Sequence, residues 1–334
     1  MNANIKIAFV TELPLHGKVP DNYPNMRTEF AWMHTLNADH FNITKFQDVK
    51  DYDHVFIIFP KGEVYLNAVG GKLIDKQNPI SPLLRIDLIG RLKQSNKKVH
   101  FIQEGPHWLW NDYEIPDQIY YYNMISSCDS IFCHNLFDIN YYKGLFPNKK
   151  INTIQTLMID NLVKDINPTK DNKTIIGGNF ARWYGGFESY IVASNFNTEI
   201  WAQESHAKRT SEEMVDGIKH LPRLSWIDWM RSLSNFKYAV HLMPTVAAGT
   251  FSLNCAYFGI PCIGNAEVDT QNLCHPDLSV DVSDTYYARQ LAISLRENKT
   301  FYNKCSEEAK YNYHKYYSLD KWKNNLYKIL NETK

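Results

Sequence analysis

Residues suited to hold a phosphate stand together within residues 237–265, KYAVHLMPTVAAGTFSLNCAYFGIPCIGN. Apolar residues at helical spacing predict a helix over 250–258, and Gly259 fits the left-handed residue that ends it. A helix start presents backbone N–H groups and the positive end of the helix dipole. Thr250 and Ser252 add hydroxyl donors there, which predicts phosphate binding, with a simple helix cap at Thr250 as the alternative.

Two short apolar runs flank this helix and predict buried strands, over 238–243 before it and over 260–263 after it. The loop 244–249 between the first strand and the helix ends in small residues. Pro261 fits a strand entry, where its missing N–H costs no ladder hydrogen bond. The organising unit is therefore a strand, a glycine-containing loop, a helix start and a second strand.

The rest of the chain alternates strands and helices, which predicts parallel sheets with right-handed crossovers. The other expected strands cover 5–12, 41–46, 55–59, 99–103, 130–133, 151–155, 174–177 and 199–201. The other expected helices cover 28–36, 82–94, 187–193, 226–233, 285–296, 302–316 and 319–330. The polar stretch 160–173 lacks periodicity and is the expected linker between two halves.

The run from Pro244 through Gly249, Thr250 and Phe251 to Phe258-Gly259-Ile260-Pro261-Cys262-Ile263 resembles the donor-binding segment of GT-B glycosyltransferases. The resemblance is clear over 174–317 and only architectural before that. It implies an α/β chain with two Rossmann-like parallel-sheet domains facing a cleft. The expected domains are an acceptor domain over 1–160, a donor domain over 174–315, and a helix over 316–334 that packs back on the first domain.

The resemblance also implies which residues hold the donor. Gly178, Asn179 and Arg182 follow an expected strand end, where these enzymes often place a basic residue on the donor diphosphate. A surface arginine packed on the neighbouring tryptophan is the alternative for Arg182. Leu224 lies in the loop 221–225, which corresponds to the loop that contacts the nucleotide base through its backbone.

One position departs from the pattern of the large retaining family of this fold. Two glutamates spaced eight apart flank the central loop there, and the second holds the donor ribose. Those positions are Val246 and Asn254 in this chain. Asn254 can still bond a ribose hydroxyl, or can be an ordinary helix-face residue, and the stereochemical outcome stays open.

Two carboxylates follow buried strands in the first half and are the candidates for a catalytic base. Glu104 comes after the strand 99–103 and Glu12 comes at the end of the first strand. A partly buried carboxylate at a strand end has a raised pKa and can take a proton from an acceptor hydroxyl. Solvated loop carboxylates or helix caps are the alternatives, and His107 and His16 are weaker candidates.

The charge and composition of the chain argue against some classes of function. Lys and Arg total 36 and Asp and Glu total 36, whereas a protein that grips nucleic acid mainly through phosphates is usually basic. No apolar run reaches the roughly 20 residues that span a bilayer, and no signal-peptide core is present. The six cysteines lack paired metal spacing, which favours reduced, buried thiols in the cytoplasm.

The predicted function is therefore a metal-independent glycosyltransferase that moves a sugar from a nucleotide diphosphate sugar, expected to be a UDP-sugar, to a hydroxyl acceptor. The expected acceptors are a glycan, a small molecule or a modified DNA base, and no further cofactor is expected. Three alternatives stay open: a sugar-nucleotide epimerase, a phage-type sugar transferase acting on hydroxylated DNA bases, and a non-catalytic scaffold of the same fold.

Overall fold

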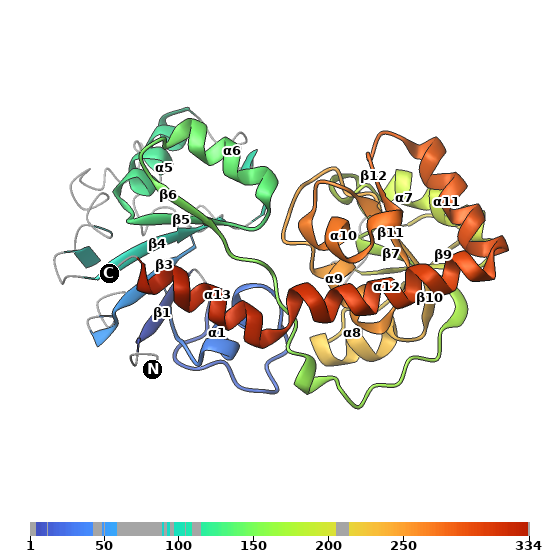
Figure 1. Ribbon diagram of the computed structural model, residues 1–334, viewed down its shortest axis with the longest axis horizontal. Coiled ribbons are helices and arrows are strands. Elements are labelled where there is room, and N and C mark those ends of the chain that lie inside the picture. Colours follow the sequence, from blue (N-terminus) through green and yellow to red (C-terminus); the bar gives the residue numbers. More distant parts are fainter. Residues whose placement is uncertain are drawn as a thin grey trace. The chain divides into compact units, whose positions relative to one another are not determined.

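A computed structural model describes residues 5–11, 13–42, 49, 51–58, 89, 92–93, 97–103, 105–108, 115–204 and 214–332 (Figure 1). The chain divides into two compact units. The first comprises residues 1–21, 32–155 and 323–334, and the second comprises residues 22–31 and 156–322. Each unit is built on its own parallel sheet, which confirms the predicted α/β class with two Rossmann-like sheets.

The first unit contains a six-stranded sheet in the order β2-β1-β3-β4-β5-β6, with every strand pair parallel. Its strands are β1 (Ile7–Thr11), β2 (Asp39–Asn42), β3 (His54–Ile57), β4 (Lys98–Ile102), β5 (Ser130–Cys133) and β6 (Lys150–Thr153). The central strands are buried along their length, because helices cover both faces of a parallel sheet. This explains why these strands are continuous apolar runs in the sequence.

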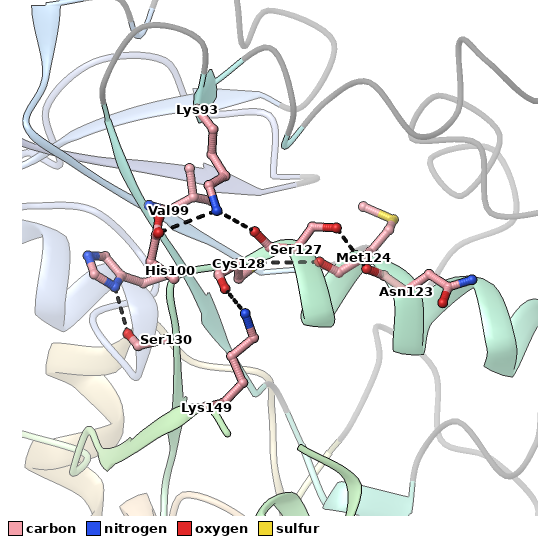
Figure 2. Close-up of polar contacts among 10 residues, drawn as sticks. Lys93, Val99, His100, Asn123, Met124, Ser127, Cys128, Ser130 and Lys149 are labelled. Atoms are coloured by element: carbon pink, nitrogen blue, oxygen red, sulfur yellow. Dashed lines mark hydrogen bonds and ion pairs between the residues drawn. The ribbon is translucent and has the colours of Figure 1, made fainter. Parts of the chain in front are cut away.

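Two lysines from outside helix α5 (Ile115–Ser127) stabilise its C-terminal end, since its own last turn has no basic residue (Figure 2). Lys93 Nζ donates to the Ser127 carbonyl at 3.0 Å, and Lys149 Nζ donates to the Cys128 carbonyl. Cations at these carbonyls compensate the negative end of the helix dipole. Burial raises the pKa of the Cys128 thiol to about 12, so this cysteine is an inert packing residue.

Three further described helices belong wholly or mainly to the first unit. They are α1 (Glu29–Leu36), α6 (Leu136–Leu145) and the C-terminal helix α13 (Leu319–Asn331). Residues 323–334 group with the first unit, where Glu332 pairs with Lys150 at 3.5 Å. The N-terminal domain was expected to be continuous to residue 160, whereas residues 22–31 group with the second unit.

The second unit has a six-stranded parallel sheet in the order β12-β11-β10-β7-β8-β9. Its strands are β7 (Asp171–Asn179), β8 (Glu199–Gln203), β9 (Ile218–Leu221), β10 (Phe236–His241), β11 (Cys262–Asn265) and β12 (Ser279–Val280). Chain order therefore runs outward in one direction from β7 and in the other from β10. This is the doubly wound arrangement, with its reversal between these two central strands.

The helices of the second unit are α7 (Gly186–Ala193), α8 (Trp226–Leu233), α9 (Thr250–Phe258), α10 (Asp269–Cys274), α11 (Thr285–Glu297) and α12 (Lys299–Tyr317). The predicted bounds of α8 and α9 are confirmed residue for residue. Ser225 is the N-cap of helix α8, and its side chain accepts from the Asp228 N–H at 3.2 Å. All six cysteines are free and buried, as expected. Within the described residues, no helix has the length and apolar character to cross a membrane.

Candidate functional site

The carboxyl ends of β7 and β10 lie side by side at the reversal point of the second sheet. Helices leave the two strands in opposite directions there, so the loops that follow the strands leave a crevice between them. The end of β7, the loops after the two strands and helix α9 contain all the predicted donor-binding residues except Leu224. The site is therefore built from these loops outward.

Two aromatic rings, those of His241 and Phe251, pack against the end of β7, because Gly177 and Gly178 have no side chains there. A Cβ on Gly177 would lie 2.6 Å from His241 Cγ and 2.6 Å from Phe251 Cδ1. Gly178 has φ +67°, and its Cβ would lie 3.2 Å from His241 Nε2. Phe251 is in the first turn of α9, so these glycines allow the start of α9 to approach the strand end closely.

The loop after β7 is tied to the loop after β10. It forms a short 3-10 helix over Arg182–Tyr184, and the Trp183 carbonyl accepts from Thr245 Oγ1 at 2.9 Å. Gly185, at φ +64°, has no room for a side chain, because a Cβ would lie 1.8 Å from the Leu242 carbonyl oxygen. Arg182 is exposed on this loop, with its guanidinium 5.5 Å from the centre of the Trp183 ring.

Gly249 is the N-cap of α9, and no side chain caps this helix. Thr250 is therefore the first helical residue and not the cap that was considered as its alternative role. Its hydroxyl lies 3.4 Å from Thr156 Oγ1. The helix presents its first-turn N–H groups and the positive end of its dipole at this point, which suits an anion.

Two other predicted residues of α9 are buried inside the unit. Ser252 Oγ donates to the Gly249 carbonyl at 3.1 Å and lies 2.7 Å from Thr270 Oγ1, so its hydroxyl supports the helix start from within. Asn254 is 1% exposed, and among the described residues its Oδ1 has no hydrogen-bond partner. An unsatisfied buried amide oxygen is costly and can accept from a ligand hydroxyl.

A pocket of about 450 Å³ lies within the second unit. Its lining residues are Pro24, Asn25, Arg27, Gly178, Tyr184, Gln203, Glu204, Arg223, Leu224, Ser225, Trp226 and Trp229. Of the predicted donor-binding residues it includes Gly178 and Leu224. The lining does not include Arg182, Pro244 or any residue of α9. Phe251 of α9 packs behind the lining residue Trp229, with ring centroids 6.4 Å apart.

Arg27 and Arg223 line this pocket and were not predicted from the sequence. Arg27 belongs to the segment 22–31, which groups with the second unit although it lies between β1 and β2 of the first unit in the sequence. Arg223 is the second residue after β9, a strand that was also not predicted. Arg223 lies in the loop 221–225 that was expected to contact the base through its backbone, but its side chain was not singled out. No local motif marks Arg27, because only the tertiary arrangement brings it to the pocket.

His241 ends β10, and its ring lies against Gly177 and Gly178 at the end of β7. Its Nε2 is shielded from solvent and, among the described residues, has no hydrogen-bond partner. Burial lowers the pKa of His241 to about 4, so the imidazole is neutral at pH 7. A neutral ring next to Gly178 does not add positive charge to the crevice, which leaves that role to arginines and the α9 dipole.

Both candidate catalytic bases, Glu104 and Glu12, lie outside the described residues. Asn179 is the last residue of β7, and its side chain also lies outside the described part. Among the residues that the structure describes, no group of three or more His, Cys, Asp or Glu side chains is placed to hold a metal ion. Metal independence and the identity of the base therefore stay predictions.

No protein-family profile matches the sequence, and no curated protein sequence matches it. Among solved structures, an alpha-glucosyltransferase in complex with UDP is similar over 98% of this chain and 100% of its own, with 11% identity and a TM-score of 0.65. Another structure of an alpha-glucosyltransferase, with UDP-glucose and DNA containing an abasic site, has 11% identity and a TM-score of 0.66, with 97% and 98% covered.

A third similar structure is Anabaena HepE in complex with UDP and glucose, with 9% identity, a TM-score of 0.66, and coverage of 98% of this chain and 100% of that chain. Such identities establish a shared fold and not a shared substrate. The two units of this chain have the fold of GT-B glycosyltransferases, which confirms the fold that the stretch 244–263 predicted.

Proposed function

We propose that this protein is a glycosyltransferase that transfers a sugar from a nucleoside diphosphate sugar to a hydroxyl group. The observation that carries the proposal is the junction at the reversal point of the second sheet, where Gly177 and Gly249 allow the start of α9 to meet the end of β7. Helix starts at such reversal points are suited to diphosphates. Full-length similarity to structures that hold UDP supports this assignment.

In this proposal the second unit binds the donor. The N-terminus of α9, beginning at Thr250, and the guanidinium of Arg182 stabilise the diphosphate. The pocket at Leu224 and Gly178 takes the nucleoside. Asn254 is 1% exposed and lies outside the pocket lining, so its unsatisfied Oδ1 accepts from a donor hydroxyl only if the start of α9 moves. We propose UDP as the nucleotide, because the similar structures contain UDP or UDP-glucose.

Transfer forms a bond from the acceptor oxygen to the anomeric carbon and breaks the bond to the diphosphate oxygen, which keeps the electron pair. The helix dipole and basic side chains stabilise the negative charge that develops there, so the proposed reaction needs no metal ion. The acceptor hydroxyl loses its proton to a base, for which Glu104 and Glu12 remain the proposed residues. The free, buried state of all six cysteines supports a reducing compartment, and we place the activity in the cytoplasm.

A hydroxylated DNA base is the second candidate acceptor. One similar structure is an alpha-glucosyltransferase with UDP and a 13-mer DNA containing a HMU base, at 11% identity, a TM-score of 0.65, and coverage of 98% of this chain and 100% of that chain. The balanced charge of this chain, with 36 basic and 36 acidic residues, argues against a nucleic-acid acceptor. Incubation with UDP-glucose and duplexes with or without hydroxymethylated pyrimidines separates the two, since only the DNA candidate predicts glucosylated duplex.

The donor proposal is tested by thermal unfolding with a panel of nucleoside diphosphates and UDP-sugars. A ligand that binds only the folded protein raises the unfolding midpoint. We expect UDP or a UDP-sugar to raise the midpoint of the wild type, and Arg182→Ala to lose most of that rise. Arg231→Ala is the matched control, because Arg231 is exposed on α8, pairs with Asp228 at 2.8 Å and does not line the pocket.

If no nucleotide raises the wild-type midpoint, the donor proposal fails and the non-catalytic scaffold takes its place. If nucleotides bind but UDP release from a UDP-sugar is never detected with any hydroxyl acceptor, the catalytic part fails while the binding part stands. A rise that is equal in the wild type and in Arg182→Ala removes Arg182 from the site.

A further inference from the structure

Two arginines from distant parts of the sequence line the pocket of the second unit. Arg27 comes from the segment 22–31, and Arg223 comes from the turn after β9. Glu204 lines the same pocket, and Glu29 acts electrostatically on Arg27. Two guanidinium groups and one carboxylate therefore line the pocket directly.

The backbone around Arg27 is held firmly on the second unit. Met26 is fully buried, and the Trp226 N–H donates to the Pro24 carbonyl at 2.7 Å. Tyr23 and Phe30 pack with ring centroids 4.5 Å apart. Arg27 therefore has a fixed starting point at the pocket, unlike an arginine on a free surface loop.

Most donor groups of the two arginines are free for a ligand. Arg27 Nε donates to Asn25 Oδ1 at 3.2 Å, which uses one of the five N–H donors of its guanidinium. Arg223 has no ion pair or hydrogen bond among the described residues. One guanidinium group can bind two phosphate oxygens through two parallel N–H···O hydrogen bonds. Both side chains are therefore suited to an anion site.

The arrangement of like charges also favours an anion. Arg27 is exposed, but the surrounding groups lower its pKa: desolvation contributes most, Glu29 raises the pKa in part, and the positive charge of Arg223 lowers it further. Arg223 therefore repels Arg27 while the pocket is empty. A phosphate between them replaces this repulsion by attraction to both groups.

The other walls of the pocket suit an organic phosphate better than a bare ion. Trp226, Trp229 and Leu224 provide apolar surface, and Gln203 provides amide donor and acceptor groups. The volume of about 450 Å³ exceeds what a single phosphate needs. The ligand therefore combines a ring or a chain with at least one phosphate.

We propose that Arg27 and Arg223 clamp a phosphate group of the ligand that occupies this pocket. The proposal rests on the proposed function for the source of that phosphate, which is the donor diphosphate. A phosphorylated acceptor is the other source with the same chemistry. The clamp adds two cations to Arg182 and to the N-terminus of α9, and it makes the segment 22–31 part of the binding site.

The clamp is tested by calorimetric titration of the full chain with UDP, uridine, pyrophosphate, and glucose 6-phosphate added to UDP-saturated protein. The variants are Arg27→Ala, Arg223→Ala and Arg27→Lys, with Arg231→Ala as the control. We expect a 10- to 100-fold lower affinity for UDP in each alanine variant, since each loses charge-assisted hydrogen bonds. The affinity for uridine should stay unchanged. The affinity of Arg27→Lys for UDP should lie between those of the wild type and Arg27→Ala, because lysine keeps the positive charge but cannot form the two parallel hydrogen bonds of a guanidinium.

The outcomes separate the clamp from the donor site. UDP binding that is equal in the wild type and both alanine variants overturns the donor clamp and leaves the proposed function intact. Glucose 6-phosphate binding to UDP-saturated protein that is lost in both variants assigns the clamp to the acceptor. If the wild type binds no UDP, the donor proposal fails; arginine-dependent pyrophosphate binding then still supports the clamp, and its absence overturns it.

Discussion

Gly249 connects the loop after β10 to the first turn of α9 in the left-handed region, at φ +70°. A Cβ at this position would lie 2.0 Å from Thr270 Oγ1 and 2.5 Å from Val268 Cγ1. The same threonine hydroxyl donates to the Gly249 carbonyl at 2.8 Å. A single residue without a side chain thus decides whether the helix start reaches its position at the sheet.

Gly249→Ala is expected to destabilise the protein by about 2 kcal/mol or more, because it combines a left-handed strain with a clash against Thr270. Gly144→Ala is the control: Gly144 lies in α6, and a Cβ there has no atom within 4 Å. That change should be neutral or stabilise by up to about 1 kcal/mol, as alanine favours a helix. Thermal unfolding of both variants measures the contrast, and similar midpoints would contradict this account of Gly249.

The sequence predicted those parts of the site whose residues are adjacent in the chain. Residues 250–258 were predicted as a helix because the apolar spacing, the glycine at its end and the loop before it are all adjacent in sequence. Arg27 was not predicted, since nothing in the segment 22–31 indicates that it folds onto the second unit. Such a residue is found only when the tertiary structure places it at the pocket.

At the scale of elements, the close approach of α9 to β7 depends on Gly177. A Cβ there would meet Phe251 of α9 at 2.6 Å and the His241 ring at the same distance. The helix therefore contacts the strand through the Phe251 ring, which lies directly against the backbone of Gly177. The position of the helix N-terminus, and with it the anion site, follows from this contact.

Gly177→Ala should displace the Phe251 ring and lower UDP affinity, by about tenfold if the helix start shifts. Phe251→Ala should restore space for the added methyl group, so the double variant should bind UDP better than Gly177→Ala alone. A double-mutant cycle on UDP affinity and on the unfolding midpoint measures this coupling. Strictly additive effects of the two changes would mean that the ring does not transmit the change at Gly177.

Element boundaries were predicted best where hydrophobic runs are unbroken. Strand β5 was predicted to the residue because SIFC is buried at every position. Strand β9 (Ile218–Leu221) was missed: it lies at the edge of its sheet and only Ile218 is buried. Helix α5 was missed because Ile115 and Ile119 are exposed, which breaks the amphipathic pattern that a sequence search relies on.

At the scale of the whole molecule, buried histidines connect stability to pH. His100 lies in a chain of polar groups across three strands, 2.8 Å from His54 Nδ1 and 2.7 Å from Ser130 Oγ. Burial, with the neighbouring His54, lowers the pKa of His100 to about 3. Burial also lowers the pKa of His241 and of His275 to about 4. Both units therefore contain histidines that stay neutral while folded.

These histidines predict acid sensitivity. Because their folded pKa values lie below the unfolded value of about 6.5, the unfolded chain takes up protons that the folded chain does not. Stability should be constant from pH 8 to 7 and should fall below pH 6.5, by up to about 1.4 kcal/mol per pH unit for each histidine. Unfolding midpoints from pH 8 to 4 measure this. A midpoint that is unchanged between pH 6.5 and 5 would contradict the neutral, buried state of these rings.

Hydrogen–deuterium exchange of the full chain with and without saturating UDP tests the central claim most directly, because it locates the nucleotide without assuming an acceptor. The account predicts slower exchange in three stretches of the second unit: 178–185 after β7, 221–226 after β9, and 249–254 at the start of α9. The segment around Arg27 should be protected with them if the clamp holds the donor. Protection confined to other parts of the chain would contradict the claim that a donor nucleotide binds at the reversal point of the second sheet.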